Sequence, residues 1–385
     1  MKLTHRTVNG THQRMHSRIS TAKLDAVFGT NRALEIKNDC DELEAYKPLV
    51  VGTANTGRRH PELFERLTRM NCQFFLKAEP HSPAHLIEEA TSMYRAHDCD
   101  SVITVGGGSS IGIGKALSLT DEAIFIALPT TYSGSEATAI TGRRVNGEKR
   151  TTIDDRCRPA RIIYDPLLTK TLPIEVSLGS AANCMAHAVD AMYAADAGPV
   201  TAVLARKVLE TIRDNLPILE RAPEDITIRE NLLVAGFLGG TLVSMHGIAL
   251  HHQLCHVIGG IYGTPHGANN IAVLPNAVAY NQGAVPEADK LLSHVFQSTC
   301  PANAIFNFFT EVSGDTSLSR FNLPADAVSK IVARQMDHSG YNPRAMDEVS
   351  LERCVRSAIE GTPPMSLMKP PGFPLPAHTN PKDTG

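Results

Sequence analysis

The sequence predicts an α/β N-terminal domain with a parallel dinucleotide-binding sheet over residues 22–172 and an all-helical catalytic domain over residues 173–361. Three observations lead to this prediction. A chain of 385 residues is too long for one ordinary core. Its first part alternates short β-rich apolar runs with helical stretches, which is typical of a parallel sheet covered on both faces. Its later part has long helical periodicity with few strand candidates.

Strands in the first part are predicted at KPLVVGT, CQFFLKA, SVITVGG, AIFIALPT and ARIIY, with helices through 61–70, 83–97 and from 110 onward. The last strand leads into two turns that contain proline, and we place the domain boundary there. In the second part, VTAVLARKVLETIRDNL and IRENLLVAGFLGGTLVSMH show the clearest helical periodicity.

The two ends are predicted to lie outside the folded domains. Residues 1–21 are basic and polar, without the apolar stretch of a secretion signal, and read as a flexible extension; a weak organellar presequence is the alternative. Residues 362–385 are rich in proline and poor in core residues, which predicts a disordered tail.

Composition bounds the partners and the compartment. A net charge of −3 gives no reason to expect nucleic acid, and no apolar run approaches the roughly 18 residues that span a membrane. The 8 cysteines form no CxxC pair, so we expect a reducing, cytoplasmic environment. A small-molecule enzyme fits these features.

A glycine-rich turn follows the strand SVITVGG and opens a helix. Glycine lets a backbone approach a phosphate closely, and the free amides at the start of a helix attract anions. One strand later, PTTYSGSE places hydroxyl groups where ligands bind in open parallel sheets. The two turns predict a nicotinamide dinucleotide site formed by Gly106, Gly107, Gly108, Ser109, Ser110, Thr130, Thr131, Tyr132 and Ser135.

The residues at the end of the strand KPLVV are those expected to distinguish NADH from NADPH. Thr53 and Asn55 are the candidate contacts there, and the acidic residue that would select NADH is missing. Arg58 and Arg59 either meet a phosphate or begin a solvated helix. The sequence therefore permits NADH or NADPH.

Histidines are concentrated between positions 251 and 266. His252 and His256 are four residues apart and share a helix face, and His266 follows a turn that returns the chain toward them. Asn183 and His187 repeat the spacing of four on another predicted helix. The pattern predicts a functional site in place of scattered core histidines.

Six motifs now give a resemblance to a known family: GGGSSIGIGK, PTTYSGSE, IIYDPLLTKTLP, NCMAHAVDAMYA, HHQLCHVIGG, and TPHG followed by LPN. In this order and approximate spacing they resemble the iron-containing alcohol dehydrogenase family. That resemblance implies the two-domain architecture shared with dehydroquinate synthase, a nicotinamide cofactor and a homodimer. The short PTTYSGSE turn, Asn183 and the HHxLCHxxGG sequence look most like the maleylacetate reductases within it.

The resemblance also implies roles. Metal-dependent members use an aspartate and three histidines, which map onto Asn183, His187, His252 and His266; an amide oxygen is a poorer ligand than a carboxylate. We therefore expect no metal, with His187, His252 and His266 as ligands if one binds.

A metal-free reductase would act on an activated C=C or C=O bond of an unsaturated oxo acid, as in aromatic compound catabolism. His256 or His266 would donate the proton, while His187 and His252 would polarise a carbonyl or orient a carboxylate. Asn183, Lys149 and Arg344 are the predicted substrate contacts, with Arg150 beside them; solvated surface roles are the alternative for these three cations.

Two departures leave the substrate open. Asn270 and Asn276 stand where maleylacetate reductases carry histidines. The alternatives to a metal-free reductase are a metal-dependent alcohol dehydrogenase and a non-redox lyase or cyclase that uses the histidine pocket.

Overall fold

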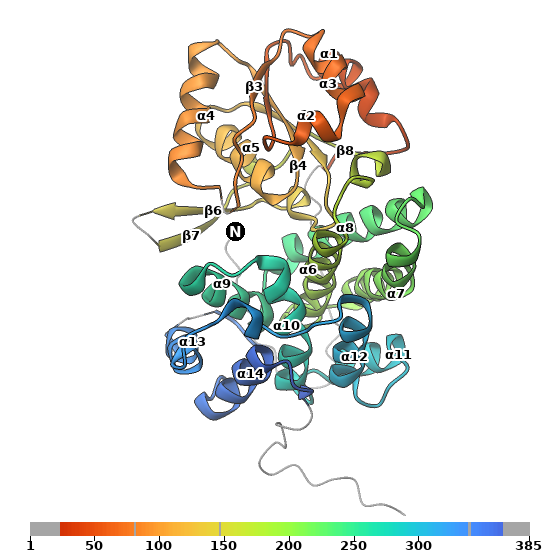
Figure 1. Cartoon of the computed structure of the whole chain (residues 1–385), viewed down its shortest axis with the longest axis vertical. Coiled ribbons are helices and arrows are strands. Elements are labelled where there is room, and N and C mark those ends of the chain that lie inside the picture. The colour runs from red at the N-terminus through yellow and green to blue at the C-terminus, as the bar shows by residue number, and fades with distance from the viewer. Residues whose placement is uncertain (1–23, 81, 146–147, 338–339, 365–385) are drawn as a thin grey trace, which may run out of the picture.

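The computed structural model describes residues 24–80, 82–145, 148–337 and 340–364, without the side chains of 142–151. The predicted N-terminal extension and most of the predicted tail lie outside these residues. The chain forms an α/β half, at the top of Figure 1, and a helical half below it.

The α/β half is built on one sheet in which every pairing is parallel, in the order β1-β8-β5-β4-β2-β3. This confirms the predicted parallel sheet. Its strands are β1 (Ala26–Phe28), β2 (Pro48–Val51), β3 (Gln73–Phe75), β4 (Ser101–Gly106), β5 (Ile124–Pro129) and β8 (Arg161–Tyr164). Its helices are α1 (Ile36–Glu42), α2 (Thr56–Arg59), α3 (Pro61–Thr68), α4 (Ala84–Ala96) and α5 (Gly108–Thr120).

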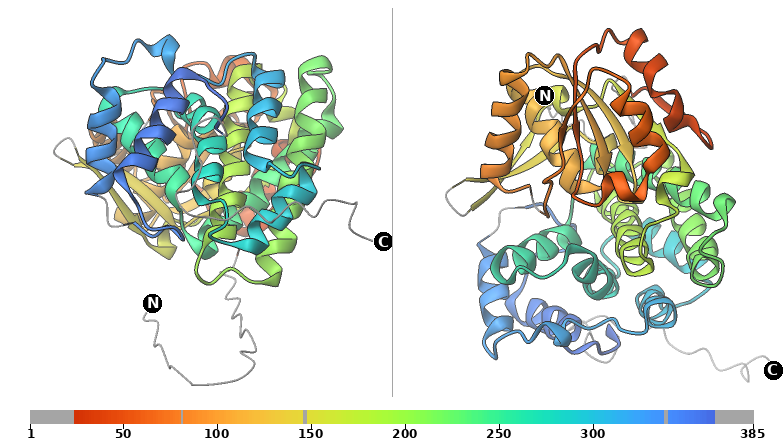
Figure 2. Two further views of the ribbon diagram at one scale, coloured as in Figure 1. Left: turned by 90° about the horizontal axis from the view of Figure 1, so that it is seen from below. Right: turned by 45° about the horizontal axis from the view of Figure 1, so that its top comes forward.

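Successive strand residues are buried on opposite faces of this sheet, between the two helical layers seen in Figure 2. In β2, Leu49 and Val51 pack toward the side of α4 and α5, whereas Val50 packs toward α1 and α3. Full burial of such a side chain contributes roughly 1.5–3 kcal/mol, which explains why these strands read as continuous apolar runs.

A separate antiparallel hairpin of β6 (Ile140–Val145) and β7 (Glu148–Ile153) projects from this half. We did not predict it. A signal was present, because Asn-Gly at 146–147 between two β-rich runs is a strong hairpin sequence.

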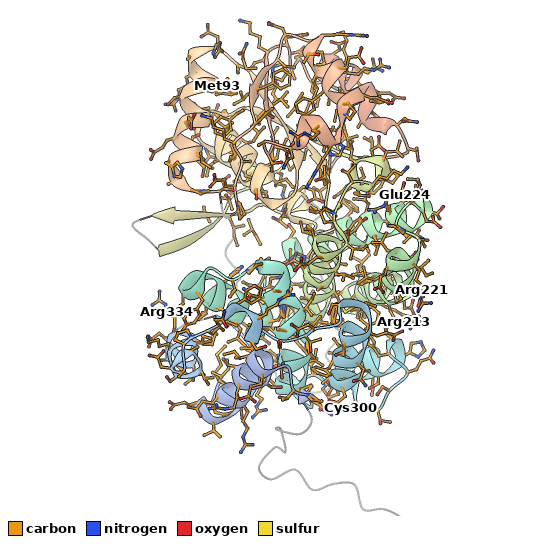
Figure 3. All side chains as sticks on the ribbon, in the orientation of Figure 1. Met93, Arg213, Arg221, Glu224, Cys300 and Arg334 are labelled. Atoms are coloured by element: carbon orange, nitrogen blue, oxygen red, sulfur yellow. The ribbon has the colours of Figure 1, made fainter. Side chains whose placement is uncertain are left out.

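The helical half confirms the predicted long helices. It contains α6 (Ile174–Tyr193), α7 (Pro199–Arg221), α8 (Ile226–His246), α9 (Leu250–Tyr262), α10 (His266–Asn281), α11 (Pro286–Val295), α12 (Pro301–Ser313), α13 (Ala327–Met336) and α14 (Glu348–Glu360). Helix α6 is its centre: from Ser177 to Tyr193 nearly every residue is buried. Charged side chains such as Arg221 and Glu224 lie on the outer rim (Figure 3).

Helix α8 corrects one expectation from the sequence. By length and composition it is apolar enough to cross a bilayer, although 56% of that stretch is buried inside the structure. Its packing against α6 and α7 is that of a core helix.

The two halves share one hydrophobic core. Ile111 and Tyr132 of the α/β half belong to the same buried cluster as Met185 and Leu232 of the helical half. At the junction, Gly134 has a φ of 74°, and a Cβ atom there would lie 2.1 Å from the carbonyl oxygen of Gly236. The turn that follows β5 therefore rests directly on the backbone of α8.

Candidate active site

The two predicted cofactor turns lie side by side at the carboxyl edge of the sheet. The backbone N–H of Thr130 donates to the carbonyl oxygen of Gly106 over 3.1 Å. A Cβ atom on Gly107 would lie 2.6 Å from Cγ2 of Thr131, so a larger residue here would have to displace the Thr131 side chain. The structure thus brings together two turns that are about 20 residues apart in the sequence.

This edge fits a nicotinamide dinucleotide. The Oγ atom of Ser110 is buried and lacks a hydrogen-bond partner among the described residues. Gly108 begins α5, is exposed, and has open space where its Cβ would lie. An orphaned hydroxyl and an open glycine at a helix start suit the diphosphate of such a cofactor.

The other residues predicted to bind the cofactor differ in their exposure to solvent. Thr53, Asn55, Ser109, Thr130, Thr131 and Ser135 retain solvent exposure at this edge. Tyr132 does not: its side chain is 1% exposed and its hydroxyl accepts a hydrogen bond from buried Arg229 over 2.9 Å. The Tyr132 ring therefore anchors the turn to α8, and cofactor binding by Tyr132 stays a prediction.

A buried lysine ties α5 to the second turn. Nζ of Lys115 donates to the carbonyl oxygens of Ser135 and Ile140 and to Oγ1 of Thr138, each over 2.7 Å. Burial lowers the pKa of Lys115 to about 7. The three acceptors fix the segment after PTTYSGSE against the glycine helix.

Asn183 is the centre of the histidine group. Its Oδ1 atom lies 3.2 Å from Nε2 of His252, 3.1 Å from Nε2 of His266 and 3.3 Å from Nδ2 of Asn270. Its Nδ2 atom donates to the carbonyl oxygen of Ser133 over 3.1 Å and lies 3.3 Å from Nε2 of His187. Because a carbonyl only accepts, the contact with Ser133 fixes which way the amide points.

These contacts join three helices and the second cofactor turn. Asn183 and His187 are on α6, His252 is on α9, and His266 begins α10. Ser133 belongs to the turn after β5, so one side chain links the histidine group to the cofactor edge. The predicted constellation is therefore one connected site.

His252 is held from behind by two residues that we did not predict. Its Nδ1 atom lies 2.8 Å from Oδ2 of Asp190 and 3.2 Å from Nδ1 of His251. Nε2 of His251 faces the carbonyl oxygen of Asn270 at 3.2 Å, so His251 donates there and its Nδ1 accepts. A spacing signal existed for Asp190, because 183, 187 and 190 fall on one face of a helix.

Burial separates the four predicted histidines into two pairs. His187 and His252 are 6% and 3% exposed, and their rings stack at 4.7 Å between centroids. Burial lowers the pKa of His187 well below its usual value, so this ring is neutral. His256 and His266 are less buried, and their rings face each other at 6.1 Å. The second pair is the accessible one.

No carboxylate is among the four side chains that converge at Asn183. The four converging groups are one amide and three imidazoles, which leave the charge of a divalent ion uncompensated. The amide nitrogen of Asn183 also lies on the side of His187, where a metal ligand would present a lone pair. Asp190, His251 and His252 place three donor atoms within 4.8 Å of one another, but hydrogen bonds among them explain that cluster.

Arg344 lies away from the histidine group. Its guanidinium donates to the carbonyl oxygen of Tyr280 and to Oγ of Ser350, at the far end of α10 from His266, which argues against the predicted contact with the substrate. Lys149 and Arg150 lie on β7, but their side chains are outside the described residues. Asn276 is 1% exposed, and its Nδ2 atom donates to the carbonyl oxygen of Ala272 in its own helix.

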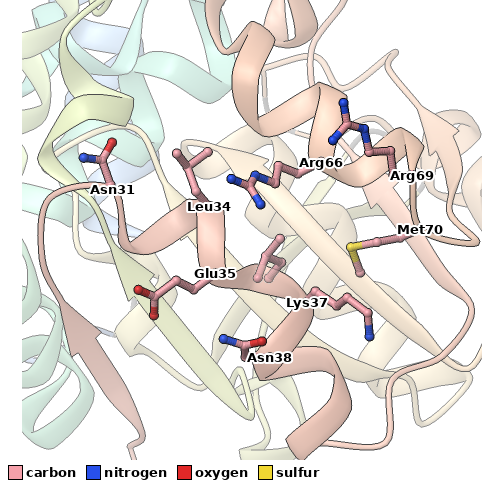
Figure 4. A pocket seen from close by; sticks show the side chains of 9 residues that line it. Asn31, Leu34, Glu35, Lys37, Asn38, Arg66, Arg69 and Met70 are labelled. Atoms are coloured by element: carbon pink, nitrogen blue, oxygen red, sulfur yellow. The ribbon is translucent and has the colours of Figure 1, made fainter.

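A surface cavity of about 670 Å³ lies elsewhere, between α1 and α3 (Figure 4). Its lining includes Glu35, Lys37, Arg66 and Arg69. It contains none of the predicted site residues.

A parallel sheet with a glycine turn faces a buried histidine group in the helical half, an arrangement that suits a nicotinamide-dependent oxidoreductase. The chain belongs to the iron-containing alcohol dehydrogenase family. Residues 25–166 match the family described as iron-containing alcohol dehydrogenase, and residues 178–359 match the C-terminal region described for the Fe-containing alcohol dehydrogenase family.

Individual relatives agree with this assignment. The chain is 32% identical to a maleylacetate reductase of Sphingobium indicum over 340 residues, which cover 88% of this chain and 96% of the relative. The crystal structure of maleylacetate reductase from Agrobacterium tumefaciens matches with a TM-score of 0.84 at 32% identity, covering 90% and 98% of the two chains. That of an iron-containing alcohol dehydrogenase from Corynebacterium glutamicum matches with a TM-score of 0.85 at 27% identity, covering 92% and 100%. The predicted family and its reductase branch are confirmed.

Proposed function

We propose that this enzyme is a metal-independent NAD(P)H-dependent reductase that acts on an unsaturated oxo acid of the maleylacetate type. The main support for this proposal is the set of contacts made by the side-chain amide of Asn183. This amide gathers His187, His252 and His266 at the place where metal-dependent relatives would hold an ion, and also contacts Ser133 of the cofactor edge.

The cofactor, when bound, supplies a hydride, which adds to one carbon of the activated C=C bond. The protein supplies the proton that completes the saturated product, 3-oxoadipate in the case of maleylacetate. His256 or His266 donates this proton, because these two rings are accessible while His187 and His252 are buried. Imidazole suits this role because its ordinary pKa lies near neutral pH.

The inner residues keep the donors in place. Asp190 and His251 hold the His252 ring, and Asn183 connects that ring to His266 through one oxygen atom. Asn270 donates to the same oxygen and is otherwise enclosed, with 0% exposure. It therefore supports the site from behind, through Asn183 and through the contact of its carbonyl oxygen with His251.

The decisive experiment follows oxidation of NADH and of NADPH at 340 nm with maleylacetate, simple enones and aldehydes, each with and without a chelator. We expect chelator-resistant oxidation with maleylacetate. Activity that a chelator abolishes would indicate a metal-dependent alcohol dehydrogenase. Absence of nicotinamide oxidation with every substrate would favour a non-redox descendant.

We further propose a cytoplasmic homodimer that serves aromatic compound catabolism. Light scattering on the eluting peak of a size-exclusion column tests the dimer: a mass near twice 41.6 kDa supports it.

A further inference from the structure

The turn after β2 has no carboxylate that would bind the two hydroxyls of an adenosine ribose and repel a 2′-phosphate. From Pro48 to Pro61 the sequence contains no Asp or Glu. A Cβ atom on Gly52 would lie 2.8 Å from Oγ1 of Thr56, so position 52 cannot carry a longer side chain without displacing Thr56. The hydroxyl of Thr53 is already 3.0 Å from that of Thr56.

This turn lies beside the glycine turn of the cofactor edge. Strands β2 and β4 are neighbours, and Val51 pairs with Thr104, two residues before Gly106. The carboxyl ends of the two strands therefore reach the same edge of the sheet. In dinucleotide-binding sheets an acidic residue near this place selects NADH, and an arginine accommodates the 2′-phosphate of NADPH.

Two arginines follow the turn at once. Arg58 and Arg59 end α2 and are both exposed. No carboxylate of a described residue forms an ion pair with either of them, whereas Arg69 and Arg95 pair with Glu65 and Asp121. An uncompensated pair of guanidinium groups is suited to a phosphate dianion, which accepts bidentate hydrogen bonds.

The positive charge of Arg59 acts on the neighbouring side chain of His60. Burial and, second to it, the charge of Arg59 lower the pKa of His60 to about 4. His60 therefore stays neutral at physiological pH and adds no charge of its own.

We propose that Arg58 and Arg59 form a binding site for the 2′-phosphate of NADPH, and that the enzyme prefers NADPH over NADH. This inference rests on the proposed function, since it requires a nicotinamide cofactor at the edge formed by Gly106–Ser110 and Thr130–Ser135.

The test uses two cofactor fragments, 2′,5′-ADP and 5′-AMP, whose binding to the intact enzyme is measured by titration calorimetry. The variants are Arg58→Gln, Arg59→Gln and the double variant. Arg66→Gln is the matched control, because Arg66 is an exposed arginine on the next helix that lines the cavity in Figure 4. Circular dichroism confirms that each variant is folded.

We expect the unmodified enzyme and Arg66→Gln to bind 2′,5′-ADP at least 10-fold more tightly than 5′-AMP, about the value of one charged hydrogen-bonded contact. In the double variant this ratio of affinities should fall below about 3-fold, mainly because 2′,5′-ADP binds more weakly. The ratio of kcat/KM for NADPH over NADH should fall in parallel.

Equal binding of the two fragments, or an unchanged ratio in the double variant, would overturn the 2′-phosphate site while leaving the reductase proposal intact. If neither fragment binds and neither NADH nor NADPH is oxidised with any substrate, the proposed function fails together with this inference.

Discussion

Nδ1 of His252 lies 2.8 Å from Oδ2 of Asp190, and the two side chains are almost entirely buried. This contact fixes the ring from the side opposite to Asn183. Asp190→Asn removes the charge that holds the ring. Changing the partner that orients a metal-ligating histidine lowers metal affinity or activity about 10- to 100-fold, and we take this as the guide for a histidine oriented in the same way. We expect kcat to fall by that amount while the Kd for NADPH changes less than about 3-fold.

Asp196→Asn is the matched control, because Oδ1 of Asp196 lies 2.7 Å from Nδ1 of His246, outside the site. Its kcat should stay near that of the unmodified enzyme. An equal loss in both variants would mean that Asp190 acts through stability alone.

His256→Ala and His266→Ala test the proton donor. Loss of a general acid lowers turnover by about 10²-fold or more, with cofactor binding preserved. Single-turnover kinetics and calorimetry with NADPH measure the two quantities. Near-normal turnover in both variants would show that neither His256 nor His266 is the proton donor.

Asn183→Asp tests the exclusion of metal. A carboxylate among the Nε2 atoms of His187, His252 and His266 supplies the anionic ligand that the group lacks. We expect zinc or iron in purified protein to rise from trace to about one ion per chain, measured by plasma mass spectrometry. Asn183→Ala, which removes the amide without adding charge, should remain at trace level; equal metal in both variants contradicts the role of Asn183.

Gly108→Ala tests the cofactor edge with little risk to folding. The added Cβ meets no atom within 4 Å, but it occupies the open space at the start of α5. We expect the Kd for NADPH to rise about 10-fold at an unchanged melting temperature, since a methyl group obstructs the approach of a phosphate. Gly260→Ala, which also adds its Cβ to open space, is the control and should leave this Kd as it was.

His60 predicts a loss of stability in acid. Its folded pKa of about 4 lies below the unfolded value near 6.5, so the unfolded state takes up the proton first as pH falls. The stabilisation is complete above pH 6.5 and is lost as pH falls toward 4. Between pH 7.5 and pH 5 the free energy of unfolding should drop by roughly 2 kcal/mol less in His60→Gln than in the unmodified enzyme.

Urea titrations at the two pH values measure this difference. His97→Gln, at an exposed histidine after α4, should follow the unmodified enzyme. The same drop in His60→Gln as in the unmodified enzyme would contradict the assignment.

The sheet was predictable because its strands are buried on both faces, which leaves short apolar runs that propensity alone identifies. The convergence of Asn183, His187, His252 and His266 followed from helical spacing together with the resemblance. Asp190 escaped notice because an acidic residue in a helix usually faces solvent, and only the packing of α6 against α9 buries it. Arg344 was misplaced because its position depends on the long return of the chain through α11 to α14.

The contact of Gly134 with Gly236, within a core that spans both halves, has a consequence for engineering. A fragment ending at residue 172 would expose the apolar faces of Ile111 and Tyr132, and the remainder would expose those of Met185 and Leu232. Exchanging the cofactor half with that of a relative would therefore have to preserve a backbone-to-backbone seam that tolerates no added side chain. Heating should melt the two halves in one transition, so calorimetry would record a single peak.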